Sequence, residues 1–428
     1  MSLVNNMDNN KLSFMLLSPG WPLKYHPNGI VTYIQNIISG FDEYIKPIIM
    51  TSNLHHENGN ESSVIDLSSF HKKRGVVSKL CNKALGSQAM PAYIKNKCRE
   101  YKAQNGYDSI IRAINTLNNK VDLIEVEESF GIAKYLVKQT NIPIVTRLHG
   151  PWFIHGPIMH QDKNDGYRAR VSAEGEAIKL SDGVTAPSLD VLNRVREFYD
   201  IPLSNAQVIP NPVPPVPHEN QWQERVGEKQ TILVVGRFDL HKGGDLALDA
   251  FRLVALNNQD VELLFVGPDR GVVIRTVSYS FDEYLEEFIP ETNIKKRIKF
   301  LGHCESEEIS TLRKGATVTF MPSRYDNFPM SLLEALAVGS PIVAAAVGGM
   351  KEMIIDDYNG LLAVSESVES MAEKLTQLLN DTEKRHLFSI NAIRDCQYRF
   401  SPETVAKQTE AFYRQVIDKK TIKKRLEE

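Results

Sequence analysis

Cysteine, net charge and long apolar runs are all scarce in this chain. Its 428 residues include four cysteines, at positions 81, 98, 304 and 396, and no two form a C-x-x-C pair. This spacing indicates neither a zinc knuckle nor a disulfide framework, so reduced thiols are expected. The formal net charge of −3 gives no reason to expect a nucleic-acid partner. No uninterrupted apolar run reaches the roughly 18 residues of a membrane-spanning helix, and the first residues lack a basic leader. We therefore expect a soluble cytoplasmic protein.

Short apolar runs that alternate with longer helix-like segments are the main pattern that is present. A length of 428 residues fits two domains of about 200 residues each. Runs that are apolar on both faces are typical of buried parallel strands with helices between them. The expected strands are 11–18, 46–52, 121–126, 142–150, 182–188 and 206–210, then 231–236, 261–267, 298–302, 317–323, 340–346 and 360–364. Six strands on each side of a break predict an α/β protein with two doubly wound sheets.

A proline-rich segment marks the break between the two halves. NPVPPVPHENQW, residues 211–222, contains four prolines and reads as a stiff, extended linker. The predicted organisation is an N-terminal domain over 1–210, the linker over 211–222 and a C-terminal domain over 223–400. A final helix is predicted over 402–418, and residues 401–428 are expected to pack back toward the N-terminal domain.

Residues 72–102 form a basic segment. They contain nine Lys and Arg against one acid, Glu100. One interpretation is a patch that contacts an anionic membrane surface or a lipid-linked pyrophosphate acceptor, which would make the protein peripheral to a membrane. The other, which the weak apolar periodicity favours slightly, is a solvated insertion with ordinary surface lysines.

The loop after strand 231–236 reads RFDLHKGG and precedes a predicted helix. Two cations beside a helix N-terminus, here Arg237 and Lys242, suit a diphosphate, and Gly243 with Gly244 lets the backbone approach a ligand. The loop is neither a Walker A loop nor a GxGxxG loop. Two surface cations near a turn are common, so the loop alone does not identify a site.

The segment RYDNFPMSLLEALAVGSPIVAAAVGG, residues 324–349, combines a long apolar run with few charges. Asp326 or Asn327 is expected to cap a helix that has Pro329 in its first turn and ends at Gly339. Glu334 is the one charged residue of the apolar run, and its neighbours one turn away are apolar. A solvated glutamate is one interpretation. The other is a carboxylate that accepts hydrogen bonds from the vicinal hydroxyls of a ribose, with Asp326 facing another part of the same ligand.

The spacing from Asp326 to Glu334 resembles the acid-x7-acid signature of the retaining nucleotide-sugar glycosyltransferases of family 4. VVGRFDLHKGGDLALDAF is similar to the G-R-x4-K-G loop of this family. In the first half, SPGWPLKYHPNGIVTYIQNI resembles its N-terminal glycine loop, and VTRLHG its strand that ends in histidine. The resemblance implies the GT-B fold, in which two Rossmann-like domains face each other across a cleft. It also implies transfer of a sugar from a nucleotide-diphosphate sugar to a hydroxyl acceptor, with retention, in polysaccharide or glycoconjugate assembly.

The resemblance further implies a role for each matching residue. Arg237 and Lys242 would hold the donor diphosphate and stabilise it as it leaves, and Glu334 would bind the ribose. Asp326 would contact the transferred sugar near its reacting face, and His149 would contact its hydroxyls. The other donor-binding positions would be Gly29 at the phosphates, Gly302, His303 and Cys304 beside the base, and Phe328, Met330 and Ser331 at sugar hydroxyls or phosphate.

No cofactor is expected beyond the donor, which would be a UDP- or GDP-sugar. The chain has no D-x-D pair, so a metal-bridged diphosphate is not indicated, and Arg and Lys would take the metal's place. The acceptor would be a glycan, a lipid-linked molecule or a small molecule with a hydroxyl group.

Several departures from the family pattern leave the sugar open. The first acid is Asp326 where Glu is usual, Pro329 stands where glycine is typical, and Asn28 precedes Gly29 where the family often has Gly-Gly. The histidine of VTRLHG could also simply bond to the backbone. Two other functions remain: a non-catalytic nucleotide-sugar-binding scaffold, and a sugar-nucleotide epimerase that uses the pair at 127–128 for acid–base chemistry.

Overall fold

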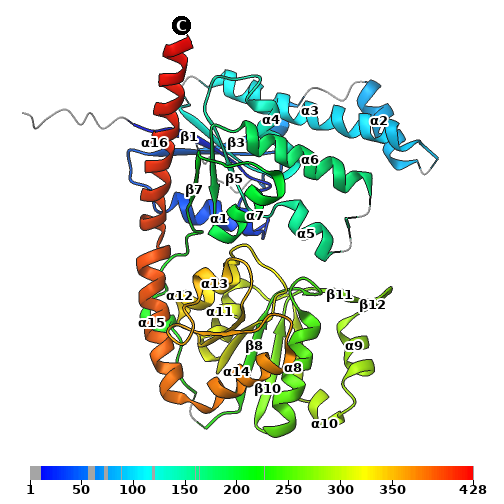
Figure 1. Ribbon diagram of the computed structural model, residues 1–428, viewed down its shortest axis with the longest axis vertical. Helices are drawn as coiled ribbons and strands as arrows, with labels where there is room; N and C mark the ends of the chain where they lie inside the picture. Colours follow the sequence, from blue (N-terminus) through cyan, green and yellow to red (C-terminus); the bar gives the residue numbers. More distant parts are fainter. Residues whose placement is uncertain are drawn as a thin grey trace, which may run out of the picture.

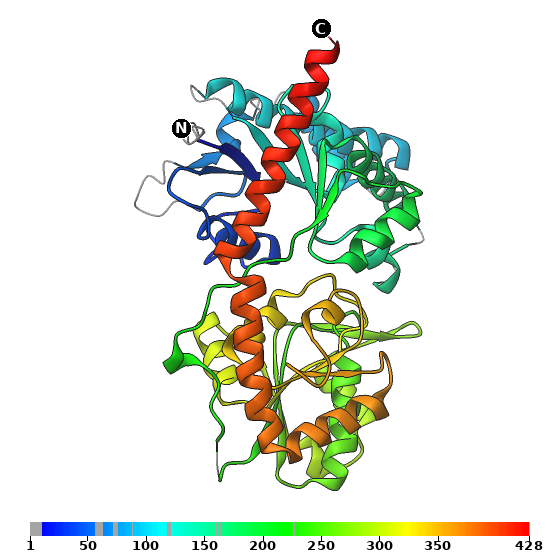
Figure 2. The same cartoon turned by 60° about the vertical axis from the view of Figure 1, so that its left-hand side comes forward.

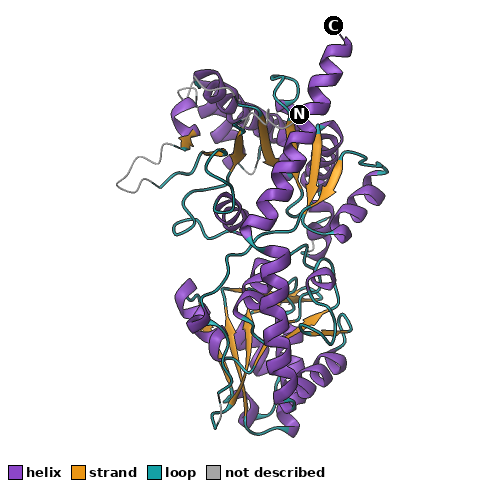
Figure 3. Cartoon of the chain, turned by 90° about the vertical axis from the view of Figure 1, so that its left-hand side faces the viewer, coloured by secondary structure: helices purple, strands orange, loops and turns teal. Residues whose placement is uncertain are grey.

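Two α/β domains, one above the other, make up this computed structural model (Figure 1). The structure describes residues 11–55, 63–71, 76–87, 89–117, 121–159, 161–162, 164–225 and 227–427. Helices flank the strands of both sheets, as Figure 3 shows. This layering buries the strands on both faces, which explains why they read as continuous apolar runs.

The N-terminal sheet has seven parallel strands in the order β3-β2-β1-β4-β5-β6-β7. They are β1 (Ser13–Leu17), β2 (Lys46–Thr51), β3 (Val64–Asp66), β4 (Leu123–Glu127), β5 (Ile144–Arg147), β6 (Gly183–Ala186) and β7 (Ala206–Val208). The C-terminal sheet has six parallel strands in the order β13-β10-β8-β14-β15-β16. They are β8 (Gln230–Val235), β10 (Val261–Val266), β13 (Ile298–Gly302), β14 (Val318–Met321), β15 (Ile342–Ala345) and β16 (Leu361–Ala363).

The predicted class of two doubly wound parallel sheets is confirmed. All twelve predicted strands correspond to strands of these sheets, and the prediction missed the edge strand β3. It also missed a small three-stranded sheet made of β9 (Phe238–Asp239), β11 (Asp269–Ile274) and β12 (Val277–Tyr279). β3, β11 and β12 are largely exposed or only half-buried, so they lack the apolar pattern of a core strand. β9 is buried, but its two residues are too few to show a pattern.

The helices lie between the strands, as the alternating pattern predicts. In the N-terminal domain they are α1 (Gly29–Ile38), η1 (Leu67–Phe70), α2 (Val76–Gly86), α3 (Ala92–Thr116), η2 (Ser129–Gly131), α4 (Ile132–Leu136), α5 (Trp152–Ile158), α6 (Asp165–Leu180) and α7 (Leu189–Tyr199). After η3 (His218–Asn220), the C-terminal domain has α8 (Gly244–Asn257), α9 (Phe281–Phe288), α10 (Thr292–Lys295), α11 (Ser306–Gly315), α12 (Met330–Val338), α13 (Met350–Met353), α14 (Val368–Asn380) and α15 (Thr382–Phe400).

The last helix, α16 (Pro402–Glu427), crosses from the C-terminal domain to the N-terminal one. Figure 2 shows it in red along the upper domain, directly after α15. Its residues Phe412, Tyr413 and Val416 are buried in the same core as β1 and α1. The helix continues through the basic segment to residue 427, whereas the sequence prediction ended it at 418. Its lysines and arginines are compatible with the helix because straight-chain residues lose little freedom there.

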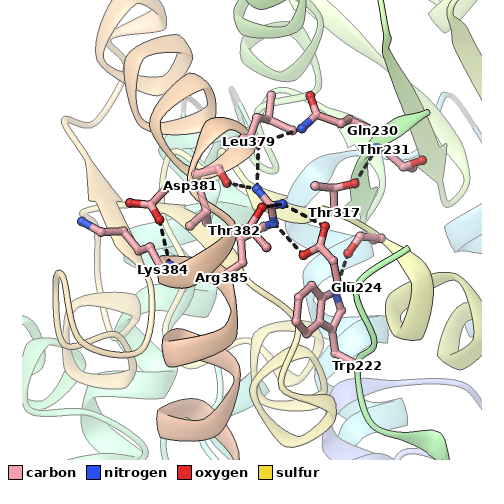
Figure 4. A network of polar contacts seen from close by, with 12 residues as sticks. Trp222, Glu224, Gln230, Thr231, Thr317, Leu379, Asp381, Thr382, Lys384 and Arg385 are labelled. Atoms are coloured by element: carbon pink, nitrogen blue, oxygen red, sulfur yellow. Dashed lines mark hydrogen bonds and ion pairs between the residues drawn. The ribbon is translucent and has the colours of Figure 1, made fainter. Parts of the chain in front are cut away.

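A buried polar clasp fixes the chain where the linker enters the C-terminal domain (Figure 4). The guanidinium of Arg385 binds both carboxylate oxygens of Glu224, at 2.9 and 2.8 Å, and donates to the carbonyl of Leu379 at the end of α14. Trp222 lies two residues before Glu224, and its indole N–H donates to the carbonyl of Ala316 at 2.7 Å. These contacts hold the linker against α14, α15 and the loop before β14.

The basic segment 72–102 folds largely into the antiparallel-packed helices α2 and α3, which extend to one side of the upper domain (Figure 1). Its residues 72–75 and 88 lie outside the described part of the chain. Cys81, Ala84 and Cys98 pack between the two helices. Among the described residues, no helix is both long enough and apolar enough to cross a bilayer.

Candidate functional site

The site lies where loops at the carboxyl ends of strands from both sheets meet. The side-chain amide of Asn327, after β14, donates to the carbonyl of His149, after β5. The hydroxyl of Tyr325 donates to the carboxylate of Asp190, after β6, at 3.0 Å. Doubly wound sheets bind ligands at these strand ends, and here the strand ends of the two domains face one another.

The loop between β8 and α8 presents the two predicted cations. Asp239 organises the loop, since its carboxylate accepts from Nε of Arg237 at 2.6 Å and from the backbone N–H of Lys242 at 2.7 Å. Gly243 has φ +69°, and a Cβ there would lie 2.2 Å from the carbonyl oxygen of Pro322. Only glycine therefore fits this close approach to the loop after β14, as the sequence suggested.

Lys242 and Asp326 form an ion pair that joins the loop after β8 to the loop after β14. The ammonium nitrogen lies 2.5 Å from Oδ2 of Asp326, and both side chains are mostly buried. Burial alone would raise the pKa of Asp326, but Lys242, His241 and His155 outweigh it and lower the pKa below its usual value. Asp326 is thus a carboxylate at neutral pH. An ammonium has three N–H donors, so Lys242 can keep Asp326 and still bind a phosphate oxygen.

Helix α12, which follows the Asp326 loop, carries Glu334. The structure gives this carboxylate a partner that the sequence did not reveal. Oε2 of Glu334 accepts from Nη1 of the buried Arg313 at 2.6 Å, so the structure supplies a cation for this carboxylate. Pro329 is the residue before the helix, and neither Asp326 nor Asn327 caps it, which corrects the predicted start. The reason is tertiary, because both side chains are bound elsewhere in the site. The helix ends at Gly339, as predicted.

The other positions predicted to bind the donor lie at the end of β13 and at the start of α12. Gly302 ends β13 with φ +66° and open space at its Cβ position, and His303 beyond it is exposed. Cys304 packs against the sheet, and burial raises the pKa of its thiol. The side chain of Phe328 is in the hydrophobic core, so only its backbone could contact a ligand. Met330 and Ser331 open α12, where the first N–H groups have no partner within the helix.

The N-terminal domain contributes His149 and Gly29. The ring of His149 packs edge-to-face on Tyr33, and burial beside Arg147 lowers its pKa well below the usual value, so it is neutral. Gly29 begins α1 after the cap Asn28, and no atom lies within 4 Å of its Cβ position. Within the described chain, no hydrogen bond or ion pair joins either residue to Lys242 or Asp326, although the backbone carbonyl of His149 accepts from Asn327.

Glu128, one of the two candidate acid–base residues, has a different role. Its carboxylate accepts from the backbone N–H groups of His149 at 2.9 Å and Gly150 at 2.6 Å. Burial and the nearby Glu174 raise its pKa to about 8, while these two backbone donors oppose the shift. Glu128 is fully buried and holds the His149 loop in place.

The sequence prediction missed the residues that complete the site through contacts between distant segments. Arg313 pairs with Glu334, and His155 meets His241 across the domain boundary at 3.2 Å. His241 directly precedes Lys242 and His155 follows His149 by six residues, which are the only signals the sequence offered. Among the described residues, no group of three or more His, Cys, Asp and Glu side chains could hold a metal ion.

The fold and this site define the chain as a glycosyltransferase of the GT-B class. The family described as "Glycosyltransferase Family 4" matches residues 27–216, and that described as "Glycosyl transferases group 1" matches residues 218–395. The two matches together cover both domains. The chain belongs to the family 4 glycosyltransferases with the GT-B fold.

Relatives and solved structures agree with this assignment. An uncharacterized glycosyltransferase of Methanocaldococcus jannaschii is 25% identical over 93% of this chain and 98% of its own length. D-inositol 3-phosphate glycosyltransferase of Xylanimonas cellulosilytica is 26% identical over 62% of this chain and 64% of its own length. Sucrose-phosphate synthase of Thermosynechococcus elongatus has a similar structure, with a TM-score of 0.67 and 17% identity over 95% and 99% of the two chains. HepE of Anabaena, in complex with UDP-glucose, has a TM-score of 0.59 and 16% identity over 93% and 98%.

Proposed function

We propose that this protein is a retaining glycosyltransferase that moves a sugar from a nucleotide-diphosphate sugar to a hydroxyl acceptor in polysaccharide or glycoconjugate biosynthesis. The observation that carries the proposal is the convergence of Arg237, Lys242 and Asp326 on loops that face His149 of the other domain. UDP is the first nucleotide to test, because HepE, which has the same fold, was solved with UDP-glucose.

The chemistry follows from where charge develops. Departure of a nucleoside diphosphate builds negative charge, which the cations Arg237 and Lys242 and the N-terminal amides of α12 would stabilise. The sugar becomes oxocarbenium-like, and the carboxylate of Asp326 would favour that charge. Lys242 would link the two events, since it touches Asp326 already and can reach a phosphate oxygen. The half-exposed Glu334 has a second oxygen available for a ribose hydroxyl.

The two alternative functions fit the geometry less well. An epimerase needs acid–base groups free to exchange protons with substrate, but both oxygens of Glu128 hold backbone N–H groups. Glu127 lies in the same buried surroundings, where desolvation raises its pKa. A non-catalytic scaffold would have no need for the Lys242–Asp326 pair, whose burial of two charges costs stability unless it serves a site.

Ligand-induced stabilisation tests the donor class directly. Thermal unfolding is measured with UDP, GDP, ADP, TDP and CMP and their sugars, with and without EDTA. A ligand at 100 times its Kd stabilises the folded state by about 2.7 kcal/mol. We expect one diphosphate series to stabilise the protein equally in EDTA, and release of that diphosphate when acceptors are added.

The matched variants decide whether the stabilisation comes from the proposed site. Glu334→Gln should abolish it, whereas Glu383→Gln, at an exposed position of α15, should not. Stabilisation that survives Glu334→Gln would contradict the ribose role. Failure of every donor series to bind or turn over would contradict the proposed function, and a block of turnover by EDTA would contradict the metal-free site.

We also propose that the α2–α3 hairpin contacts an anionic membrane surface, where a lipid-linked acceptor would be found. Val76, Leu80 and Tyr93 are 75%, 61% and 63% exposed, which is unusual for three large apolar residues on one hairpin. Lys79 and Lys83 lie exposed on the same helix, α2. Apolar side chains beside lysines match the chemistry of an acidic lipid surface.

Vesicle flotation tests this contact. The protein should float with vesicles that contain phosphatidylglycerol and not with pure phosphatidylcholine, and binding should fall at high salt. Leu80→Ser with Tyr93→Ser should weaken flotation, whereas Leu387→Ser on the exposed face of α15 serves as the control. Equal flotation of both variants would argue for the solvated insertion instead.

A further inference from the structure

Two histidines from opposite domains meet beside the Lys242–Asp326 pair. His155 lies on α5 of the N-terminal domain, and His241 lies in the C-terminal loop that also carries Lys242. Nδ1 of His155 is 3.2 Å from Nε2 of His241, and the rings meet edge-to-face with centroids 5.0 Å apart. Neither residue has a role in the donor-binding scheme above.

The N-terminal domain is built to deliver His155 to this position. The first N–H of α5, on Trp152, donates to the buried carboxylate of Glu174 at 2.8 Å, which fixes the start of the helix. A Cβ on Gly150 would lie 3.0 Å from Nε2 of His155, so a larger residue there would press on the ring. A Cβ on Gly156 would lie 2.7 Å from the ring of Tyr167. The short helix therefore has little freedom to shift.

His241 joins the two loops that carry the catalytic candidates. It directly precedes Lys242, and its carbonyl accepts the backbone N–H of Arg324 at 3.0 Å, two residues before Asp326. The side chain is buried, and within the described chain its Nδ1 has no hydrogen-bond partner. The contact with His155 is thus the polar contact that orients this imidazole. A displacement of His241 would move Lys242 directly and the Asp326 loop through Arg324.

The surroundings keep both imidazoles neutral when they are in contact. Burial lowers the pKa of His155 to about 4, and His241 adds to the shift while Asp326 opposes it. Burial likewise lowers the pKa of His241. The charged and titratable groups that face the two rings are Asp326, Lys242, Arg237 and Asp239, together with Tyr325, whose ring packs edge-to-face on His155. A neutral pair can share one N–H as a hydrogen bond, whereas two protonated rings would repel each other.

We propose that His155 is a positioning residue for sugar transfer: from the N-terminal domain it holds His241, and with it the Lys242 and Asp326 loops, in the geometry needed for reaction. This inference rests on the proposed function. The side chain of His155 makes its hydrogen bond to His241 and makes none to Lys242 or Glu334. Its loss should therefore lower kcat by a larger factor than it weakens binding of the free nucleotide, because Arg237 and Glu334 would still hold the nucleotide.

The variants are His155→Phe, which keeps a ring but cannot bond, and His155→Gln, which keeps one hydrogen bond. His218→Phe, at an exposed site in η3, is the matched control. At pH 7.5 we expect kcat to fall by at least about tenfold in His155→Phe, with partial recovery in His155→Gln and no change in the control. UDP or GDP should still stabilise all four proteins in thermal unfolding, and any loss of affinity in His155→Phe should be smaller than its loss of kcat.

The pH profile separates positioning from a merely structural effect. The pKa of His155 is about 4 when it contacts His241 and 6.5 when it is free. As pH falls below 6.5, the free imidazole becomes protonated, and this protonation competes with the contact. Between pH 7.5 and 5.5 the contact should weaken about tenfold in the wild type. The acid limb of kcat should shrink in His155→Phe. Unchanged kcat and pH profile in this variant, or a loss of nucleotide affinity as large as the loss of kcat, would overturn the proposal.

Hydrogen–deuterium exchange decides the question without any activity. The N–H groups of Lys242 and Arg324 are bonded within the two loops, so they report on loop order. Peptides covering these residues should exchange faster in His155→Phe than in the wild type at pH 7.5, and the difference should narrow at pH 5.5. Equal exchange in both proteins would refute the positioning role even if no donor were ever found.

Discussion

The clasp between Glu224 and Arg385 gives the sharpest test of how the linker is held. Replacing Glu224 by Gln keeps the size of the side chain and removes its charge. The two side chains are only 14% and 4% exposed, so the guanidinium would stay buried without its counter-charge. Removing one partner of a buried ion pair costs about 3–5 kcal/mol. Arg385 keeps bonds to the carbonyls of Leu378 and Leu379, so we expect the lower value, about 3 kcal/mol.

Urea unfolding followed by tryptophan fluorescence measures this loss of stability in the C-terminal domain. Trp222 is close to Glu224 (Figure 4), and replacing Trp21 and Trp152 by Phe leaves it as the reporter. With an m-value of about 3 kcal/mol/M, a loss of about 3 kcal/mol shifts the midpoint by about 1 M. The reference protein carries the same two Phe replacements as Glu224→Gln and as the control variant described next, so the effects of these replacements cancel.

Glu228 provides the matched control, because it pairs with Arg225 in the same segment while 61% and 50% exposed. An exposed pair contributes about 0–1 kcal/mol, so Glu228→Gln should leave the midpoint nearly unchanged. Equal shifts for Glu224→Gln and Glu228→Gln would refute the argument from burial. A large shift with a changed m-value would instead indicate that the domain no longer unfolds as one unit.

Two further replacements test buried charges elsewhere. Lys242→Met leaves the buried Asp326 without its ammonium, so we expect a loss of about 3 kcal/mol at pH 8 as well as loss of transfer. Lys242 helps to hold the pKa of Asp326 in the folded protein below its unfolded value. The ion pair therefore stabilises the fold at pH values above the unfolded pKa, and this stabilisation is lost as pH falls through the folded pKa. The stabilities of the wild type and of Lys242→Met should therefore converge in acid. Adding Asp326→Asn should restore stability and not activity; a double variant as unstable as Lys242→Met would contradict this. Tyr413→Phe removes the hydroxyl that donates to the buried Glu125 at 2.7 Å, and should cost about 1–3 kcal/mol. Burial raises the pKa of Glu125 and the Tyr413 hydroxyl lowers it, so the cost of Tyr413→Phe should grow with pH. Tyr398→Phe, at an exposed tyrosine, is the control. Equal losses of stability in the two variants would refute the anchoring role of α16.

The sequence by itself determined the α/β architecture and half of the candidate site. Strands such as β15, apolar and buried at every position, fit between two helical layers, so their pattern was sufficient to predict two parallel sheets. Arg237, Lys242 and Asp326 lie in loops that follow strands, and Glu334 is the one charge of an apolar run on α12, so local patterns were enough to single them out. The small strands β11 and β12 escaped prediction because they are largely exposed and carry no core pattern.

Only the tertiary structure decided what these side chains touch. Arg313 is 21 residues from Glu334, and His155 is 86 residues from His241, so no local pattern could pair them. The sequence left Glu334 in need of a partner and Glu128 as a candidate acid–base group; the fold gave the first a buried arginine and bound the second to the backbone of His149 and Gly150. Periodicity and spacing report which residues are buried and which lie at strand ends. The partners of a buried charge depend on the packing of distant segments, because burial without a partner is too costly to persist.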